Sequence, residues 1–370
     1  MLVSTIPILQ FGTSRFLQAH ADLFVSEAMV AGEAIGPIAV VQSSGDPARA
    51  QRVGALAKGY DVRLRGLRDG DKIDETVRVK SIARAFSLST DRVEVSRLLA
   101  TDVRIVVSNT SEAGLAPQPA DRAADFDDAM SYPAKLAYLL RERFAAGGEP
   151  IQVMPTELVR NNGQTLRNLV LDAASEMDDA YRAWLREEVV WVNSLVDRIV
   201  SEAIEPAGAV AEPYALWAIE DRPGLLLPCC HPAIQVVADL GPIERRKLFI
   251  LNLGHTWMVS RWLARGRQGA TFVRDLMTDR EAAGELAALY SEEVLPGFVA
   301  AGEGEGAEAY IHVTMERFAN PFLDHRLEDI AQNHGTKLGS RLSAFLDWAR
   351  LHGDRGAKPR LAAALEGPKA

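Results

Sequence analysis

The sequence predicts an α/β protein, in which an N-terminal doubly wound domain of the Rossmann type precedes a mostly α-helical C-terminal domain. Two observations lead to this prediction. Short β-branched runs alternate with helix-patterned stretches up to about residue 240, and clear strand patterns are absent after it. Strands that alternate with helices indicate crossover connections and a parallel sheet. The sequence DLGP interrupts the pattern at Asp239–Pro242, so we expect domains at residues 1–240 and 241–370.

The first domain opens with a βαβ pattern, the usual start of a doubly wound nucleotide-binding fold. Ile6–Phe11 is predicted as a buried strand, and Arg15–Ala31 as a helix because its apolar residues recur at helical spacing. Ile38–Gln42 (IAVVQ) is predicted as the second strand. The other predicted elements are helices at Asp46–Leu56 and Pro133–Ala145, and strands at Tyr60–Leu64, Glu75–Ile82, Val103–Val107 and Ile151–Met154.

The second domain is predicted as helices joined by loops. We expect a flexible loop at Gly302–Gly306 (GEGEG). The tail, Gly353–Ala370, is polar and interrupted by Pro and Gly, so we expect it to be peripheral. The helix patterns lie at Arg246–Ala264, Asp279–Leu289, Ile330–Leu342 and Ser343–Leu351.

Composition excludes several classes of protein. Of 370 residues, 48% are hydrophobic, which exceeds what a disordered chain carries, and the net charge of −9 argues against a nucleic-acid partner. No apolar run approaches the ~18 residues that span a bilayer, and Met1–Gln10 lacks the basic region of a signal peptide. We therefore expect no membrane partner. The adjacent Cys229 and Cys230 form no disulfide framework, so we also expect a protein of the reducing cytoplasm. The sequence does not indicate an oligomeric state.

A turn with one glycine, GTSRFL, follows the first strand. Of the three glycine positions of the dinucleotide fingerprint only Gly12 matches, and Ser14 and Leu17 stand at the other two. Exposed N–H groups at the start of a helix attract pyrophosphate, and the Ser14 hydroxyl could donate to it. The alternative is an ordinary strand–helix turn. The residues of this turn that we predict to contact a cofactor are Gly12, Thr13, Ser14, Arg15 and Phe16.

Two further strand ends are candidates for the same cofactor site. Gln42 and two serines stand where an Asp or Glu would hold the adenosine ribose, and Arg49 and Arg52 follow, either as ligands of a 2′-phosphate or as solvated helix arginines. The choice between NAD and NADP therefore stays open. The stretch SNTSEAG follows the strand at Val103–Val107, and its small polar residues would serve a ligand or cap a turn. Its predicted cofactor contacts are Asn109, Thr110 and Glu112.

The most informative segment is KLFILNLGHT, in which Lys247, Asn252 and His255 occur in an apolar stretch. At about 100° per residue, Asn252 lies ~140° and His255 ~80° from Lys247 on a helix, so all three share one side. Gly254 would let a ligand approach. Burial lowers the pKa of a lysine, which can then exchange a proton with an alcohol or carbonyl while Asn and His donate to the same oxygen. The alternative is a helix with a snorkelling Lys, a capping Asn and a satisfied His.

A metal centre is not expected. Cys229-Cys230-His231 is the one suggestive run, but adjacent ligands do not both reach one tetrahedral ion, and no second Cys/His pair follows at zinc spacing. The proton transfer described above requires no metal.

These segments resemble the polyol-specific long-chain dehydrogenase/reductase family, also called the mannitol dehydrogenase family, over roughly residues 5–342. The motif K-x4-N-x2-H-T matches the family's catalytic segment, and VSNTSEAG resembles its cofactor-side strand end. Glu157-Leu158 is the pattern of the hexuronate reductases (tagaturonate and fructuronate reductases) rather than the mannitol branch. Other matching segments are SYPAKL, ELVRNNG, NSLVDRIV, EPYALW, RFANPFLDH and NHGTKLGSR.

The resemblance implies NAD-dependent, zinc-independent hydride transfer between a hexuronate and its aldonate (altronate or mannonate), with NADP as the open alternative. It implies that Lys247 is the general acid/base and that Asn252 and His255 polarise the reacting carbonyl. A carboxylate substrate also needs a cation. The predicted substrate-binding residues are Asn162, Arg160, His325, Lys337 and Arg341.

Two other functions remain as alternatives. One is a polyol dehydrogenase of the mannitol type that acts on an uncharged or phosphorylated sugar alcohol. The other is a catalytically inactive nucleotide-binding sensor, against which the intact Lys247, Asn252 and His255 argue.

Overall fold

The computed structural model describes residues 5–44 and 50–367. Its internal contacts divide the chain into two compact units. The first unit consists of Met1–Leu64, Glu75–Ala211 and Ala215–Leu240. The second unit consists of the long segment that begins at Gly241 and of two short pieces from earlier in the chain, Arg65–Asp74 and Glu212–Tyr214.

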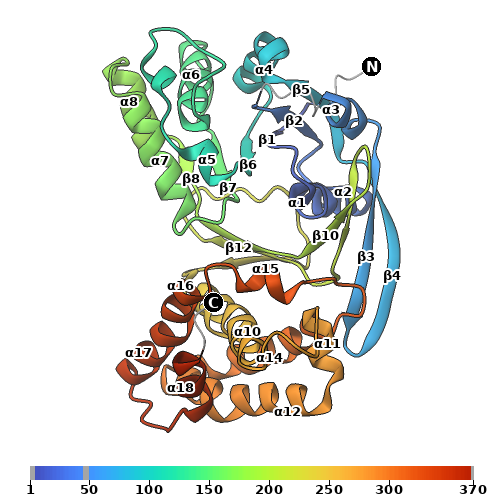
Figure 1. Ribbon diagram of the computed structural model, residues 1–370. Helices are drawn as coiled ribbons and strands as arrows, with labels where there is room; N and C mark the ends of the chain where they lie inside the picture. Colours follow the sequence, from blue (N-terminus) through green and yellow to red (C-terminus); the bar gives the residue numbers. More distant parts are fainter. Residues whose placement is uncertain (1–4, 45–49, 368–370) are drawn as a thin grey trace. The chain divides into compact units, whose positions relative to one another are not determined.

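A six-stranded parallel sheet forms the centre of the first unit (Figure 1). Its order, β5-β2-β1-β6-β7-β8, is the order of a doubly wound dinucleotide-binding fold. The order reverses between β1 and β6, and Ile8 of β1 pairs with Ile38 of β2 on one side and Ile105 of β6 on the other. The strands are β5 (Ile82–Ser87), β2 (Ile38–Gln42), β1 (Ile8–Phe11), β6 (Ile105–Ser108), β7 (Gln152–Pro155) and β8 (Val190–Trp191).

Helices cover both faces of this sheet, which confirms the predicted Rossmann-type class. Leu9 and Phe11 enter one apolar core and Ile8 enters the other, so β1 is buried on both sides. This burial explains why the strands are continuous apolar runs rather than alternating ones. The first core packs α4 (Leu88–Thr101), α6 (Tyr132–Ala145), α7 (Asn162–Ala173) and α8 (Asp179–Glu187), and the second packs α2 (Ala21–Ala31) and α3 (Ala50–Leu56).

Two predicted elements of the first unit are divided in the structure. The helix predicted at Arg15–Ala31 is two helices, α1 (Arg15–Gln18) and α2, because His20 has a non-helical backbone and its ring is hydrogen-bonded to Leu216 O at 2.9 Å. The strand predicted at Glu75–Ile82 contains the end of β4 (Asp71–Val79) and the start of β5. The predicted helix at Asp46–Leu56 begins in residues outside the described part.

Two smaller sheets were not predicted as sheets, although the predicted strands at Tyr60–Leu64 and Glu75–Ile82 overlap two of their strands. One has the order β10-β11-β3-β4, with β10 (Val200–Ala203), β11 (Gly208–Ala211) and β3 (Tyr60–Arg68) beside β4. The other has the order β13-β12-β9, with β13 (Ile234–Val237), β12 (Leu216–Glu220) and β9 (Ser194–Asp197). Most of these strands have only four or five residues, so their sequence signal is weak.

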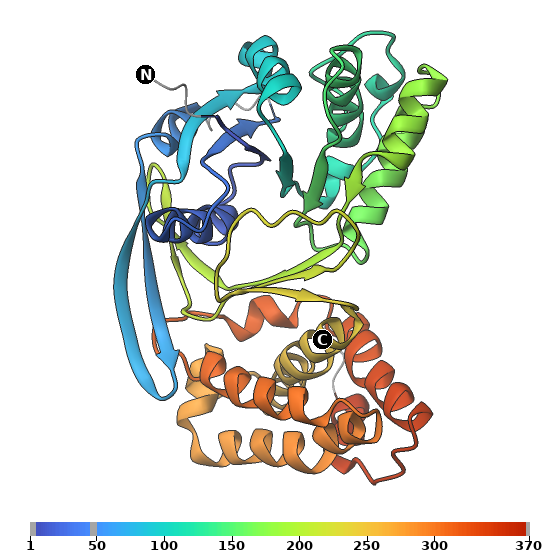
Figure 2. The same cartoon turned by 180° about the vertical axis from the view of Figure 1, so that it is seen from behind.

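The Gly241–Ala370 segment of the second unit is helical as far as it is described, and Figure 2 shows its helices from behind. The glycines predicted as a loop begin α14, which starts at Gly304, and the predicted peripheral tail contains α18, whose Leu361 is fully buried. No described helix is both long and apolar enough to cross a membrane. The helices are α9 (Gly241–Arg246), α10 (Leu253–Ala264), α11 (Val273–Thr278), α12 (Arg280–Ala288), α13 (Leu295–Ala300), α14 (Gly304–Phe318), α15 (Leu327–Ala331), α16 (His334–Lys337), α17 (Ala344–Leu351) and α18 (Pro359–Glu366).

Three π-helices interrupt these α-helices. They are η3 (Lys247–Asn252), η4 (Leu289–Val294) and η5 (Leu338–Ser343). Both η4 and η5 contact η3, so the three wide turns meet inside the second unit. Such turns occur frequently at functional sites.

Candidate functional site

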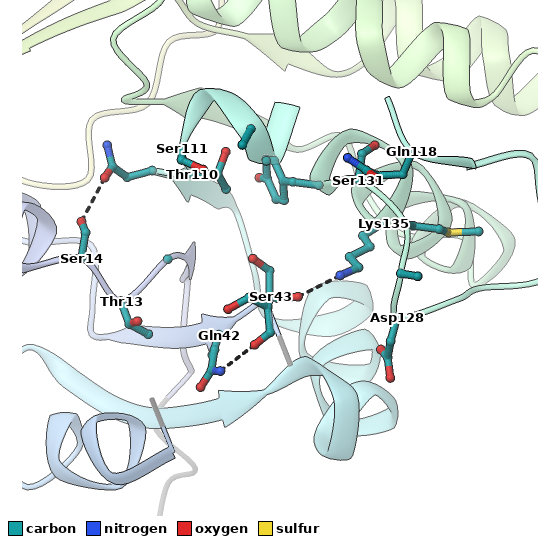
Figure 3. A pocket seen from close by; sticks show the side chains of 18 of the residues that line it. Thr13, Ser14, Gln42, Ser43, Thr110, Ser111, Gln118, Asp128, Ser131 and Lys135 are labelled. Carbon is teal, nitrogen blue, oxygen red and sulfur yellow. Dashed lines mark hydrogen bonds between the residues drawn. The ribbon is translucent and has the colours of Figure 1, made fainter. Parts of the chain in front are cut away.

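A cavity of about 620 Å³ opens at the carboxyl ends of the central strands of the first unit (Figure 3). Doubly wound folds bind ligands at this edge, where the strand order reverses. Side chains from the ends of β1, β2 and β6 line one part of the cavity, and the segment 118–135 lines another. Six residues predicted to contact the cofactor lie in this lining: Gly12, Thr13, Ser14, Gln42, Asn109 and Thr110.

Gly12 occupies a position where any side chain would be strained. Its φ is 121°, in the left-handed region, and a Cβ there would lie 2.7 Å from the carbonyl oxygen of Asn109. Its N–H donates to Val41 O at 3.0 Å. The glycine therefore lets the ends of β1, β2 and β6 approach one another and form the cavity wall.

Ser14 and Asn109 bind each other across the switch point. The Ser14 hydroxyl accepts the N–H of Leu17 at the start of α1 and donates to Asn109 Oδ1 at 2.9 Å. The Asn109 amide donates to the carbonyl and hydroxyl oxygens of Thr156. The proton that we expected the Ser14 hydroxyl to offer a phosphate is therefore given to Asn109, and Ser14 shapes the turn.

The structure does not bring Arg15 and Phe16 to the cavity. Arg15 donates to Ile204 O at 2.9 Å and pairs with Glu205 at 2.6 Å, beyond the start of α1. Phe16 stacks on His20, with ring centroids 4.7 Å apart. Both side chains therefore make contacts within the first unit. These contacts account for the charge of Arg15 and the aromatic ring of Phe16.

Lys135 enters the cavity from α6, and sequence reasoning missed it. Its ammonium donates to Ser43 O at 2.8 Å, and Figure 3 shows it beside the loop that follows β2. Lys135 is 5% exposed, and this burial lowers its pKa. Arg52 also lines the cavity, whereas Arg49 and the side chain of Glu112 lie outside the described part of the chain.

Glu157 is a second group that the sequence did not single out as a ligand. Its carboxylate accepts the N–H of Thr110 at 2.8 Å and the hydroxyl of Ser108 at 3.2 Å. It is 5% exposed, and burial raises its pKa. The carboxylate joins the ends of β6 and β7 and orders the backbone that passes the cavity.

The segment after β7 contains two of the predicted substrate-binding residues. Asn162 is buried, and its amide donates to the carbonyls of Pro155 and Ser194 while its oxygen accepts the N–H groups of Gly163 and Ser194. These bonds hold the segment together, and substrate binding by Asn162 stays a prediction. Arg160 is exposed.

The three predicted catalytic residues lie in the second unit, on π-helix η3 and the first turn of α10. Lys247 and Asn252 are half-buried, and His255 is 6% exposed. The helix between Lys247 and Asn252 is wider than the expected α-helix, because the Leu253 N–H reaches back five residues to Leu248 O. Hydrogen bonds from i to i+5 bring residues five apart toward one face. The wide turn therefore brings Lys247 and Asn252 closer to a common face than the ~140° expected for an α-helix.

Gly254 does not open space for a ligand, in contrast to our expectation. A Cβ at this position would collide with the hydroxyl oxygen of Tyr290 and would lie 3.0 Å from the Phe318 ring. The Phe318 ring also packs against His255, at 4.6 Å between centroids. Gly254 is thus a packing glycine that admits side chains of the second unit.

The predicted substrate-binding residues of the C-terminal region gather near this segment. The His325 ring lies 4.7 Å from that of His255, and Arg341 donates to Asn252 O at 3.3 Å and to the Thr256 hydroxyl at 3.0 Å. Lys337 donates to Ile330 O at 2.7 Å. Together with His334, which is hydrogen-bonded to Ser260, these residues form a basic cluster: His325, His334, Lys337 and Arg341.

Burial and mutual repulsion act together in the basic cluster. Burial lowers the pKa of Lys337, and the charge of Arg341 lowers it further. Burial also lowers the pKa of His334, with contributions from Lys337 and Arg341. The positive charges of Lys337 and Arg341 repel each other, so a bound anion would stabilise both. The cluster is thus suited to receive a negatively charged group.

Within residues 5–44 and 50–367, no group of three or more His, Cys, Asp or Glu side chains is arranged to hold a metal ion. His231, which follows the two cysteines, instead pairs with Glu27 at 2.9 Å.

Comparison with known proteins adds to this geometry. A family model described as the mannitol dehydrogenase Rossmann domain matches residues 6–225, and one described as the mannitol dehydrogenase C-terminal domain matches residues 239–365. The altronate oxidoreductase of Bacillus subtilis (strain 168) is 32% identical over 94% of this chain and 76% of its own length.

Two solved structures share the fold. A D-sorbitol dehydrogenase in substrate-free form has a TM-score of 0.81 and 22% identity, covering 98% of this chain and 80% of its own. The Pseudomonas fluorescens mannitol 2-dehydrogenase, in a ternary complex with NAD and D-mannitol, has a TM-score of 0.72 and 20% identity, covering 98% and 79%.

Proposed function

Because the chain belongs to the mannitol dehydrogenase family and is an oxidoreductase acting on a CH–OH group, we propose that it interconverts a hexuronate and its aldonate by hydride transfer. The substrates are tagaturonate or fructuronate, and the products are altronate or mannonate. The observation that carries this proposal is the basic cluster attached to the segment of Lys247 and Asn252, because a sugar acid brings a carboxylate that such a cluster can bind. The name of the Bacillus subtilis relative agrees with a sugar acid.

The proposed cofactor is NAD. Gly12 shapes the turn at the switch point, and polar residues, among them Thr13, Asn109 and Thr110, line the cavity there. Doubly wound folds bind a dinucleotide at this place. When bound, the nicotinamide accepts or delivers the hydride. No acid follows β2 directly, and Lys135 and Arg52 line the cavity, so NADP must be tested beside NAD.

The chain's own residues transfer the proton and stabilise the negative charge that develops in the reaction. In the proposed mechanism, Lys247 gives a proton to the carbonyl oxygen during reduction and takes it from the hydroxyl during oxidation. Asn252 and His255 donate to the same oxygen and stabilise its developing negative charge. Arg341 and Lys337 hold the substrate carboxylate, which orients the reacting carbon. No metal ion takes part in this mechanism.

A substrate panel tests the proposal. Tagaturonate, fructuronate, fructose and fructose 6-phosphate are each offered with NADH and with NADPH, and the absorbance of the reduced nicotinamide is followed. We expect turnover of at least one hexuronate and weak turnover of both sugars without a carboxylate. Preference for fructose or its phosphate would instead support a mannitol-type polyol dehydrogenase, and cofactor binding without any turnover would support a sensor.

Lys247→Ala tests the acid/base role. We expect kcat to fall by about 10²-fold or more, because general acid–base catalysis contributes about that much. Cofactor affinity, measured by quenching of tryptophan fluorescence, should stay within about twofold. Lys80→Ala, which removes an exposed lysine of the first unit, is the control and should leave both quantities unchanged. Undiminished turnover in Lys247→Ala would refute the role.

A further inference from the structure

One side chain holds the π-helix η3 from outside. Tyr290, on η4, is 1% exposed, and its hydroxyl donates to Ile250 O at 2.8 Å. Within η3 the same carbonyl also accepts the N–H of Leu253, the residue whose N–H reaches back to Leu248 O. The hydroxyl of Tyr290 is thus a second donor to a carbonyl in the middle of the wide turn.

Gly254 creates the space that this contact needs. Because a Cβ at position 254 would collide with the Tyr290 hydroxyl, a larger residue and the Tyr290–Ile250 hydrogen bond cannot both be present without a shift. Gly254 is buried and helical, so its lack of a side chain serves close packing rather than an unusual backbone conformation. The glycine and the tyrosine therefore form one device.

The device acts on the segment that carries the proposed chemistry. Lys247 begins η3 and Asn252 ends it, while His255 follows one turn later on α10. If η3 relaxed to an α-helix, Lys247 and Asn252 would separate to about 140° around the axis. A rotation of this size would move the ammonium away from the oxygen that the amide polarises.

We propose that Tyr290 and Gly254 are positioning residues that hold η3 in its π-helical form and thereby align Lys247 with Asn252. The inference rests on the proposed function for its kinetic readout. Neither residue is proposed to touch the substrate. Tyr290 acts through the Ile250 carbonyl, and Gly254 acts by leaving room for the Tyr290 hydroxyl.

Tyr290→Phe removes only the hydroxyl and is the first test. We expect kcat for the hexuronate to fall about tenfold or more, since small misplacements of reacting groups carry large costs. The KM for the cofactor should stay unchanged, and the pH profile of kcat should shift because the surroundings of Lys247 change.

Tyr181→Phe is the matched control. Tyr181 is fully buried in the first unit, and its hydroxyl donates to Ala137 O at 2.5 Å. This variant loses the same type of hydrogen bond in a similarly buried place. It should lower the thermal midpoint by a similar amount while kcat stays unchanged, which separates positioning from general stability.

Gly254→Ala disturbs the same hydrogen bond by placing a methyl group where the Tyr290 hydroxyl lies. It should lower kcat as Tyr290→Phe does, because the new methyl group displaces the hydroxyl. In the double variant Gly254→Ala/Tyr290→Phe the methyl no longer meets the oxygen, so its loss of kcat should be smaller than the product of the two single losses. Multiplying losses would show two independent effects and contradict a single device.

Two results would overturn the inference, and they differ from failure of the proposed function. If Lys247→Ala is inactive but Tyr290→Phe keeps kcat within twofold, Tyr290 does not position the turn. If no substrate is turned over, the proposed function fails, and amide hydrogen exchange of residues 250–256 decides instead. Tyr290→Phe should then speed this exchange and Tyr181→Phe should not, and unchanged exchange in Tyr290→Phe would refute the device.

Discussion

Two side chains near the start of α2 are buried with opposite consequences for proton binding. Burial lowers the pKa of His20 from 6.5 to about 3, since the imidazolium loses hydration. Burial raises the pKa of Asp22 from 3.8 to about 7, although the Tyr60 hydroxyl donates to its carboxylate at 2.8 Å. Between pH 4 and 6.5, His20 makes the fold more stable as pH rises, whereas Asp22 makes it less stable.

Asp22→Asn should reveal this balance. Between about pH 4 and pH 7 the folded parent protein keeps a proton on Asp22, whereas the unfolded protein releases it. The free energy of unfolding of the parent therefore falls as the pH rises through this range. Asparagine keeps an acceptor for Tyr60 but has no such proton. Relative to the parent, the variant should therefore gain stability from pH 4 to pH 7, by on the order of 4 kcal/mol.

Urea unfolding at several pH values, followed by circular dichroism, measures the difference. Asp221→Asn, at an exposed carboxyl of the first unit, is the control and should give a curve parallel to that of the parent. A curve for Asp22→Asn that is also parallel to the parent's would show that Asp22 is ionised in the fold.

At the scale of elements, the turn between β1 and α1 determines whether the cavity of the first unit exists. The turn has one glycine, yet that glycine stands at the one point where φ is positive and the Asn109 carbonyl is close. Ser14 and Asn109 complete the wall with side chains that bind each other. A fingerprint with a single glycine can therefore form this turn, because side-chain hydrogen bonds hold the backbone at the positions where the usual fingerprint has further glycines.

Gly12→Ala should damage the cofactor site. The methyl group would press against Asn109 O, and the left-handed backbone adds about 1 kcal/mol of strain. We expect cofactor affinity to fall at least tenfold in a fluorescence titration. Gly32→Ala is the control, since Gly32 has φ 75° but nothing within 4 Å of its would-be Cβ. It should cost similar strain with cofactor affinity unchanged, and equal affinity in both variants would contradict the role of Gly12.

At the scale of the whole chain, the second unit is not a simple C-terminal block. Arg317 of α14 forms two hydrogen bonds with Glu212, at 3.0 and 2.8 Å, and both side chains are at most 3% exposed. Asn320 donates to Arg65 O at 3.1 Å. These contacts explain why two short pieces from earlier in the chain belong to the unit that otherwise begins at Gly241.

Arg317→Met should destabilise the second unit strongly. Breaking a buried ion pair leaves an uncompensated charge on Glu212 and costs about 3–5 kcal/mol. The double variant Glu212→Gln/Arg317→Met removes both charges and should recover a large part of that loss. Thermal unfolding measures both. A double variant no more stable than Arg317→Met would show that the pair contributes packing rather than charge compensation.

The predicted and observed structures agree where the sequence signal is local. The central strands are apolar because both faces of the sheet are buried, and the structure has strands at Ile8–Phe11 and Ile38–Gln42 inside or matching the predicted ranges. The cavity lining includes six predicted residues. Lys135 and Glu157 were missed because each reaches its partner from another element, at separations of 92 and 47 residues.

The sequence alone indicated the family and the segment with the proposed chemistry. Both follow from the residue types Lys247, Asn252 and His255 and their spacing along the chain, which do not depend on the fold. The shape of that segment depended on tertiary structure. The helical pattern of this segment predicts an α-helix, whereas the structure has the π-helix η3, whose Ile250 and Asn252 carbonyls accept hydrogen bonds from Tyr290 and Arg341, 40 and 89 residues away. The local periodicity of the sequence hardly distinguishes an α-helix from a π-helix, and in our proposal the hydrogen bond from the distant Tyr290 selects the wide form.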